Sequence, residues 1–222
     1  MKKIIKVFSI IFLVCFSFYY TEKIAYIMQS KDELMLHINK VKENYNIDYV
    51  NAVINDDTII PGINGITVNS QKSYSNMKSL NVFNEYYLEY EQVKPVISLS
   101  DNKDKTIIKG NKNKKSVAIL VKNNGLVKEY LIKKGYQIGY ENICVTDLEE
   151  VCKDNSFKVR SSLIINHQNI LTSKSSVESG DIILIEENVS VSELKVLLEE
   201  IKYRDLKIIS LNNLISEENN IN

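Results

Sequence analysis

The stretch that decides the fold is Ser116–Gly125, SVAILVKNNG. A short apolar run, Val117–Val121, ends in a polar loop of Lys122, Asn123 and Asn124, and a helix-forming segment follows at once. The first strand of an α/β domain presents a loop in this way at its carboxyl end, where such sheets bind ligands. The loop offers an amine and two amides but no carboxylate, imidazole or thiol, so it indicates where a site would lie without naming its chemistry.

Downstream of this stretch, apolar runs alternate with helix-forming segments. The run that follows Asp181 is four apolar residues long, which is typical of a buried parallel strand. Alternation at this spacing predicts an α/β fold with a mostly parallel sheet, flanking helices and right-handed crossovers. The expected strands are Ile143–Val145, Ser162–Ile165, Asp181–Ile185 and Leu206–Ile209, and the expected helices are Leu126–Lys134, Asp147–Asp154, Ser192–Arg204 and Leu211–Ser216, with a short helical turn at Ser173–Ser179.

The region before it, residues 47–110, changes period and predicts a small β-rich region with one short helix, Ser70–Leu80. Asp56 and Asp57 fall between two strands and are interpreted as solvated turn residues rather than a catalytic pair. A tyrosine cluster near residue 88 could stack on sugars, although packing in a core or hairpin explains it more simply. The expected strands are Tyr49–Ile54, Thr58–Ile60, Gly65–Val68 and Val96–Leu99, the cluster is Tyr86, Tyr87 and Tyr90, and Gly110–Lys115 is expected to be a linker.

The amino terminus has the pattern of an export signal. Met1–Lys6 carries three lysines, and Val7–Tyr20 is apolar. Bulky residues occupy the end of the apolar run, where a signal peptidase needs small ones, so we expect an uncleaved, single-pass membrane anchor over residues 1–21. A cleaved and secreted form is the second choice. The lysines on the amino side predict that the rest of the chain lies outside the membrane. Thr21–Tyr45 predicts a helical stalk or packing helix, with Ser30 and Glu33 as a capping box.

Composition excludes several classes of function. Hydrophobic residues make up 44% and charged residues 25% of the 222 residues, which is typical of a globular protein. A net charge of zero argues against a nucleic-acid partner. Cys144 and Cys152 could pair, but a strand thiol and a helix thiol buried apart are the preferred interpretation. His37 and His167 lie far from both cysteines and lack zinc-ligand spacing, so we expect no metal and no cofactor.

Several short motifs, in this order, resemble the polysaccharide deacetylase family (the NodB-homology family, carbohydrate esterase family 4). Gly135–Gly139, GYQIG, resembles the family's G-H-E-I-G step, and Gly180–Ile185, GDIILI, resembles its late strand. Leu194–Ile215 resembles the closing helix, strand and helix of the family, and Val117–Gly125 matches the strand that ends in its T-F-D-D-G loop. Ile59–Leu80 also looks like the leader region of membrane-anchored Firmicute proteins that carry this domain. The resemblance implies a truncated, deformed β/α barrel and a role in carbohydrate metabolism at the cell envelope.

The same resemblance implies that the catalytic site is degenerate. The family holds a divalent metal with an aspartate and two histidines, and uses a second aspartate as the base for a metal-activated water. The aspartate pair falls on Asn123 and Asn124, or on Lys122 and Asn123 if the loop shifts by one residue, and an amide is neither a charged ligand nor a base. The first histidine falls on Glu141 and the second near Val145, the late His-Asp pair falls on Glu186 and Glu187, and Arg160 matches the family's arginine, with Ser161 and Ser162 in place of its prolines.

Three functions follow as expectations. The first is a catalytically inactive, membrane-anchored relative of the deacetylases that binds peptidoglycan, another envelope glycan or a protein partner. The second is a structural envelope protein with no glycan role, and the third is a residual hydrolase or deacetylase that uses Glu141, Glu186 or Glu187. Those acids are otherwise solvated loop residues, and nothing in the spacing gives His167 a nucleophile. The expected divisions are 1–21 anchor, 22–46 stalk, 47–110 β-rich region, 111–217 NodB-like α/β domain and 218–222 tail.

Overall fold

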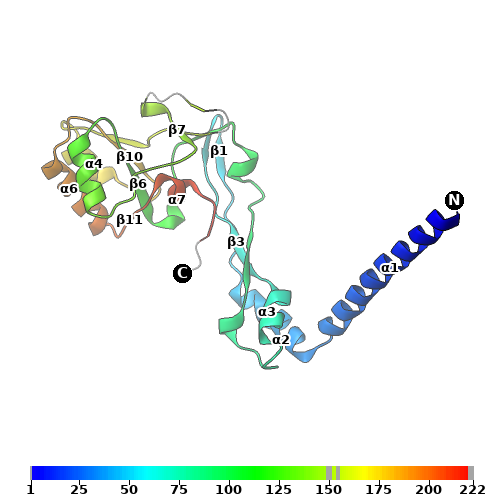
Figure 1. The fold of residues 1–222 in the computed structure, drawn as a ribbon. Helices are drawn as coiled ribbons and strands as arrows, with labels where there is room; N and C mark the ends of the chain where they lie inside the picture. The colour runs from blue at the N-terminus through cyan, green and yellow to red at the C-terminus, as the bar shows by residue number, and fades with distance from the viewer. Residues whose placement is uncertain (1, 149–151, 154–155, 220–222) are drawn as a thin grey trace. The chain divides into compact units, whose positions relative to one another are not determined.

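The computed structural model describes residues 2–148, 152–153 and 156–219. The chain divides into two compact units (Figure 1). The first comprises residues 1–47 and 66–92, and the second comprises residues 48–65 and 93–222. The division differs from the expected boundaries, because part of the β-rich region, residues 47–110, is built into the same unit as the α/β domain.

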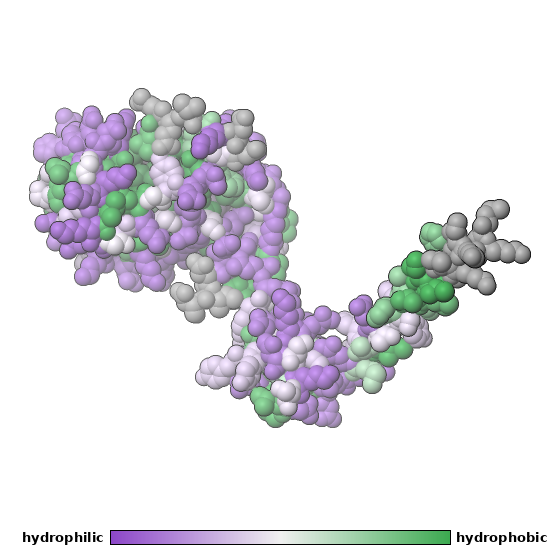
Figure 2. Space-filling view, in the orientation of Figure 1, coloured by the Kyte–Doolittle hydropathy of each residue, from purple (hydrophilic) through white to green (hydrophobic). Residues whose placement is uncertain are grey.

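The first unit begins with one long helix, α1 (Lys2–Ser30). Its segment Ile10–Ser30 is long and apolar enough to cross a membrane and is not covered by the rest of the chain. Hydrophobic side chains line much of its drawn surface (Figure 2). The helix continues without a break past residue 21, so the boundary expected there between anchor and stalk is not a structural one.

The rest of this unit is a small α+β cluster. Helices α2 (Glu33–Val41) and α3 (Ser70–Met77), a 3-10 turn η1 (Lys42–Tyr45) and the two-stranded sheet of β3 (Gly65–Val68) and β4 (Tyr90–Val93) make up most of it. Asp32, and not the expected Ser30, caps α2 by accepting a hydrogen bond from the Leu34 N–H. The core residues come from α2, β3 and α3 and from the segment before β4: Leu34, Met35, Ile38, Val68, Tyr74, Met77 and Leu88.

The expected tyrosine cluster does not form a single surface. Tyr90 is partly buried against the core of the first unit, whereas Tyr86 in the 3-10 turn η2 (Glu85–Tyr87) is 88% exposed. Tyr87 is 43% exposed. His37 packs its ring edge-on against Phe83 with 4.8 Å between centroids, as expected for a histidine with a packing role.

The second unit contains the predicted parallel sheet. Its strand order is β11-β6-β10-β9, and all three pairings are parallel. The strands are β6 (Ser116–Val121), β9 (Leu163–Ile165), β10 (Ile182–Ile185) and β11 (Lys207–Ile208). All four residues of β10 are buried, because this central strand is covered on both faces.

The two faces of this sheet enter two different cores. Alternation along β10 turns Ile183 and Ile185 toward helices α4 (Gly125–Lys133) and α6 (Val191–Tyr203). Ile182 and Leu184 point the opposite way, into a core shared with α7 (Leu211–Ile215) and a second sheet. The short helix α5 (Ile170–Ser173) and the 3-10 turn η6 (Lys174–Ser176) follow β9.

The second sheet has five strands in the order β1-β2-β5-β8-β7. They are β1 (Val53–Asn55), β2 (Thr58–Ile60), β5 (Thr106–Ile107), β7 (Ile143–Val145) and β8 (Phe157–Val159). Asp56 and Asp57 form the predicted turn between β1 and β2, and Asp56 adopts φ 48°. The expected strand Val96–Leu99 is absent from its place in the described chain, which instead forms the 3-10 turn η3 (Leu99–Asp101).

The segment Gly110–Lys115 is not the expected linker. The N–H of Gly110 donates to the carbonyl of Gly180 at 2.7 Å, and a side chain on Gly180 (φ +92°) would meet the Gly110 carbonyl oxygen at 2.3 Å. Asn111 is buried and donates to the Pro61 carbonyl. The segment, with its 3-10 turn η4 (Lys112–Lys114), therefore joins the two sheets of one core instead of separating two domains.

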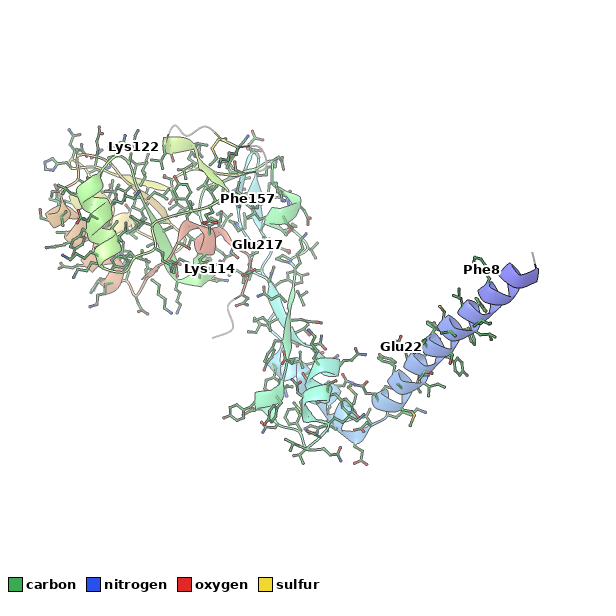
Figure 3. All side chains as sticks on the ribbon, viewed as in Figure 1. Phe8, Glu22, Lys114, Lys122, Phe157 and Glu217 are labelled. Carbon is green, nitrogen blue, oxygen red and sulfur yellow. A yellow bond between two sulfur atoms is a disulfide. The ribbon has the colours of Figure 1, made fainter. Side chains whose placement is uncertain are left out.

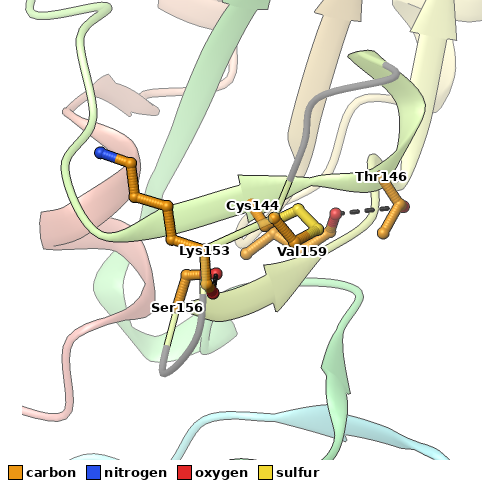
Figure 4. Close-up of a disulfide and its surroundings, with 6 residues drawn as sticks. Cys144, Thr146, Lys153, Ser156 and Val159 are labelled. Atoms are coloured by element: carbon orange, nitrogen blue, oxygen red, sulfur yellow. Dashed lines mark hydrogen bonds between the residues drawn. A yellow bond between two sulfur atoms is a disulfide. The ribbon is translucent and has the colours of Figure 1, made fainter.

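The expected separate thiols are also a wrong interpretation. Cys144 in β7 and Cys152 form a disulfide with Cα atoms 5.1 Å apart (Figure 4). Only the first part of the expected helix Asp147–Asp154 can be compared: it is a 3-10 turn, η5 (Thr146–Leu148), and residues 149–151 and 154–155 lie outside the described residues. The two cysteines are eight positions apart in the sequence, and their Cα distance is within the range of a disulfide.

The amino end of the four-stranded sheet is held by a buried carboxylate. Asp181 is 3% exposed, accepts hydrogen bonds from the Ser162 hydroxyl and the Glu178 N–H, and lies 3.0 Å from the Lys109 ammonium. Burial would lower the pKa of Lys109, but its hydrogen bonds to Asp181 and Glu178 outweigh burial and raise that pKa. Every oxygen of Asp181 therefore has a partner, and its role is structural.

The carboxyl terminus closes the same unit (Figure 3). The Glu217 carboxylate accepts hydrogen bonds from the N–H groups of Gly62 and Leu99, at 3.0 and 2.8 Å. Lys114 donates to the carbonyls of Asn213 and Ser216 at the end of α7, and burial lowers its pKa to about 8. These contacts fix the last described residues of the chain to both sheets.

Candidate functional site

The candidate site lies at the carboxyl ends of the parallel strands. Lys122, Asn123 and Asn124 follow β6, Glu186 and Glu187 follow β10, and Asn166 and His167 follow β9. Because these strands run parallel in adjacent positions, their following loops meet at one edge of the sheet. The sequence predicted this location from the β6 loop alone.

Asn124 is the most strongly bonded side chain of this edge. Its Oδ1 accepts a hydrogen bond from the Val127 N–H and so caps α4. Its Nδ2 donates to the carbonyls of Val189 at 2.8 Å and Glu187 at 3.0 Å, with a longer contact to Glu186 at 3.4 Å. The amide is thus used as both acceptor and donor. An aspartate could cap the helix but would face these carbonyl oxygens with no proton to donate.

Asn123 is exposed and has a left-handed backbone, with φ 48°. Asparagine tolerates this conformation better than most residues with a Cβ. Together with Lys122, Lys128 and Tyr140 it lines a cavity of about 380 Å³, whose wall is completed by Val121, Ile138, Gly139 and Leu148. Asn123 is therefore the predicted site residue that borders an open cavity.

The predicted acids are not brought together into a metal-binding group. Glu141 is exposed, and its backbone N–H and carbonyl pair with the side chain of Asn212 at 3.0 and 2.9 Å. Glu186 donates its N–H to Ile165, and Glu187 is exposed. Across the part of the chain that the structure describes, no group of three or more His, Cys, Asp or Glu residues could hold a metal ion.

Arg160 and Val145, the other two predicted positions, belong to the second sheet. Val145 is the last residue of β7 and is fully buried. Arg160 follows β8, is exposed, and donates its N–H to the Ile107 carbonyl at 2.8 Å. Neither residue contributes a metal ligand.

Sequence reasoning missed a polar contact at the carboxyl ends of β7 and β8. Asp147, expected to be a helix cap, accepts a hydrogen bond from the Ser161 N–H at 2.6 Å. The Ser161 hydroxyl beside it is buried and has no hydrogen-bond partner among the described residues. The two partners are 14 positions apart in the sequence, and their contact could not be predicted because β8 itself was not predicted.

His167 lies at the same edge as the β9 loop. Its Nδ1 is 2.5 Å from a carboxylate oxygen of Glu193, and the Ser190 hydroxyl donates to the other oxygen at 2.7 Å. The Ser190 hydroxyl and N–H, and then His167, lower the pKa of Glu193. The acid therefore lies between serine and histidine, whereas a catalytic triad needs the histidine in the middle. The arrangement caps α6 and does not activate a nucleophile.

The fold defined by this geometry is that of the polysaccharide deacetylase-like pseudoenzymes. Crystal structures of BA3943, described as a CE4 family pseudoenzyme from Bacillus anthracis, match this chain with a TM-score of 0.51 at 18% identity. The match covers 86% of this chain and 97% of that one. A BA3943 mutant with restored enzymatic activity matches with the same TM-score and identity, over 85% of this chain and all of that one. The predicted fold class is therefore confirmed.

A relative by sequence is the uncharacterized protein YlxY of Bacillus subtilis (strain 168). It is 39% identical over 107 residues, which is 47% of this chain. The chain spans about a third of the length of YlxY, since the matched part is 33% of that protein. No family model matches the sequence.

The residues at the strand ends do not fit the divalent metal that this fold family implies. Asn123 and Asn124 carry no charge to hold a cation, and the Asn124 amide is already bonded to backbone groups on both sides. Lys122 brings a positive charge to the cavity where a metal would need anionic ligands. No step of metal-assisted hydrolysis can be built from these side chains.

Proposed function

We propose that this chain is a catalytically inactive relative of the polysaccharide deacetylases that binds a cell-envelope glycan. The observation that carries this proposal is the set of hydrogen bonds made by the Asn124 side chain. The resemblance places an aspartate at this position. The Asn124 amide instead accepts a hydrogen bond from the Val127 N–H and donates one to the Val189 carbonyl. Such a side chain serves structure and leaves the cavity beside Asn123 available for binding without hydrolysis.

We also propose that the glycan-binding unit lies outside the membrane and is anchored by α1. The disulfide between Cys144 and Cys152 supports this placement, because disulfides persist in oxidising, extracytoplasmic environments. The lysines before the apolar segment favour a cytoplasmic amino terminus. Protease accessibility of the second unit in intact and lysed cells tests this topology, because a second unit outside the membrane is cleaved in intact cells.

The test of the function uses the full chain in detergent micelles with peptidoglycan sacculi and N-acetylglucosamine oligomers. We expect co-sedimentation without release of acetate. Asn123→Gly should weaken binding while keeping the left-handed backbone, and Asn81→Gly is the matched control, since Asn81 has the same φ of 48° in the first unit. Acetate release by the wild type, or absence of binding to every glycan, would overturn the proposal.

A second candidate function is protein interaction through the first unit. Leu80, Val82 and Tyr86 lie within seven residues of one another and are 58%, 65% and 88% exposed. Exposed apolar side chains in one short segment are typical of a contact surface. This function would gain support if sacculi did not bind and if Leu80→Ser with Val82→Ser abolished capture of an envelope protein.

A further inference from the structure

Three cavities of the second unit share lining residues with one another along residues 134–141, and we call them together the groove. The cavity at Asn123 shares Lys128, Ile138 and Tyr140 with a second cavity of about 750 Å³. The second shares Tyr136 with a third cavity of about 450 Å³, which lies between α4, α6 and β11. The groove therefore begins at the carboxyl end of β6 and extends away from the position of the family's reaction centre.

The charge of this groove is positive. The lysines that line it, taking the described residues only, are Lys122, Lys128, Lys134, Lys195, Lys202 and Lys207. The acids that line it are Glu141, Glu199 and Asp205. The whole chain has no net charge, so this excess of lysine is a local feature and would concentrate anions at the groove.

Helix capping does not account for all of these lysines. Lys134 and Lys202 lie at helix carboxyl ends, where the macrodipole favours a cation. Lys128 is the fourth residue of α4, and Lys195 is the fifth residue of α6, so both lie in amino-terminal halves that gain nothing from a cation. The helix dipole therefore accounts for two of the six lysines and leaves four, Lys122, Lys128, Lys195 and Lys207, to another explanation.

Tyrosine rings alternate with the lysines. Tyr140 borders the first two cavities, Tyr136 the second and third, and Tyr130 the third. The ammonium groups of Lys134 and Lys195 lie 5.8 and 5.6 Å from the centroid of the Tyr130 ring. Rings of this kind offer apolar faces to a sugar, and the lysines beside them offer charge at the sugar's substituents.

We propose that the groove binds an acidic glycan, a chain of sugar rings that carry carboxylates. This inference rests on the proposed glycan binding at Asn123 and extends it to a ligand class and a path. The lysines supply the complement to the carboxylates, and the tyrosines supply faces for the rings. A polyol phosphate polymer has the charge but no ring to stack, so it would pair with the lysines and leave the tyrosine rings without a stacking partner.

The experiment compares four ligands with the full chain in micelles. They are peptidoglycan glycan strands freed of stem peptides, the same strands with their lactyl carboxylates methyl-esterified, a neutral N-acetylglucosamine oligomer and polyglycerol phosphate. We expect the acidic strands to bind best and esterification to weaken binding about tenfold, which corresponds to the loss of two exposed charge contacts. Raising the salt concentration should weaken binding of the acidic strands and of polyglycerol phosphate, and should leave binding of the esterified strands and the neutral oligomer unchanged.

Two double substitutions test which lysines give the acidic strands their advantage. Lys134→Gln with Lys195→Gln should remove most of the advantage of the acidic strands over the esterified ones. Lys112→Gln with Lys115→Gln removes the same charge beside the amino end of β6 and should leave that advantage unchanged. Equal binding of acidic and esterified strands, or stronger binding of polyglycerol phosphate, would overturn the acidic-glycan proposal while leaving glycan binding intact. Absence of binding to all sugar ligands would overturn both.

Discussion

The polar side chains at the two ends of the four-stranded sheet have opposite hydrogen-bonding partners. At the amino end, Asp181 is an acid surrounded by donors, with Lys109, Ser162 and the Glu178 N–H bonded to it. At the carboxyl end, Asn124 is an amide whose nitrogen faces backbone carbonyls. A buried negative charge is thus paired with donors at the amino end, whereas a neutral amide bonded to carbonyls occupies the position after β6 at the carboxyl end.

The comparison shows that the carboxyl end is built around an amide. An aspartate that binds a metal must point one oxygen into the cavity, whereas Asn124 points its amide into the loop after β10. The loop and the amide now stabilise each other. A single substitution of Asn124 by aspartate would therefore remove hydrogen bonds that hold this loop.

The largest effect is expected at the amino end. Asp181→Ala leaves the Ser162 hydroxyl and the Glu178 N–H without their acceptor and removes one of the two partners of Lys109. Loss of a buried, paired carboxylate should lower the free energy of unfolding by about 3 kcal/mol. Urea denaturation followed by circular dichroism measures it. A change below that of an exposed surface substitution such as Asp104→Ala would show that the amino end does not hold the sheet.

The next largest effect is expected for the disulfide that joins Cys144 in β7 to Cys152. Cys152→Ser should lower the free energy of unfolding by about 2.5 kcal/mol, because it frees a short loop in the unfolded chain. A reducing agent should reproduce the loss in the wild type and have no effect on the variant. Cys15→Ser is the control, since Cys15 is a free thiol in α1. Equal stability of the reduced and oxidised forms would mean that hydrogen bonds alone fix this edge.

The sequence predicted all four strands of the parallel sheet but missed two of the five strands of the other sheet, β5 and β8, for a physical reason. The strand β6 and the strand β10 are buried on both faces, so they appear as long apolar runs. Thr106–Ile107 and Phe157–Val159 are too short to show a period and are flanked by polar residues. Their burial comes from partners distant in sequence, which no local pattern records.

The sequence placed the candidate residues along the sheet but did not reveal their contacts. The motif order placed Asn123 and Asn124 at the reaction edge, and both lie there. The sequence could not show that Asn124 is bonded to the backbone while Asn123 borders the cavity, because this depends on the path of the loop after β10. The lysine groove was missed because its members come from α4, α6 and β11 and converge only after folding.

The experiment at the carboxyl end that corresponds to Asp181→Ala is Asn124→Asp. It keeps the cap of α4 but replaces the donor to Val189 and Glu187 with an acceptor, so the free energy of unfolding should fall by about 1–2 kcal/mol. The loss should shrink as the pH is lowered through the aspartate range, because a protonated acid can donate again. Asn123→Asp is the matched control with an exposed side chain. A neutral or stabilising Asn124→Asp would show that the carboxyl end still accommodates an acid.

The smallest effect is a dependence on pH at Lys114, again at the amino end of β6. Its folded-state pKa of about 8 lies below its unfolded value of about 10.4, so between these values the unfolded chain holds more protons. The contribution of Lys114 to stability should therefore rise as the pH is raised from about 8 to 10, by less than about 1 kcal/mol per pH unit after solvent screening. Lys114→Met should lose hydrogen bonds to the end of α7 yet show a flatter profile than the wild type over this range. Parallel profiles would mean that Lys114 titrates normally, and that at the amino end only Lys109 and Asp181 have charges tied to the fold.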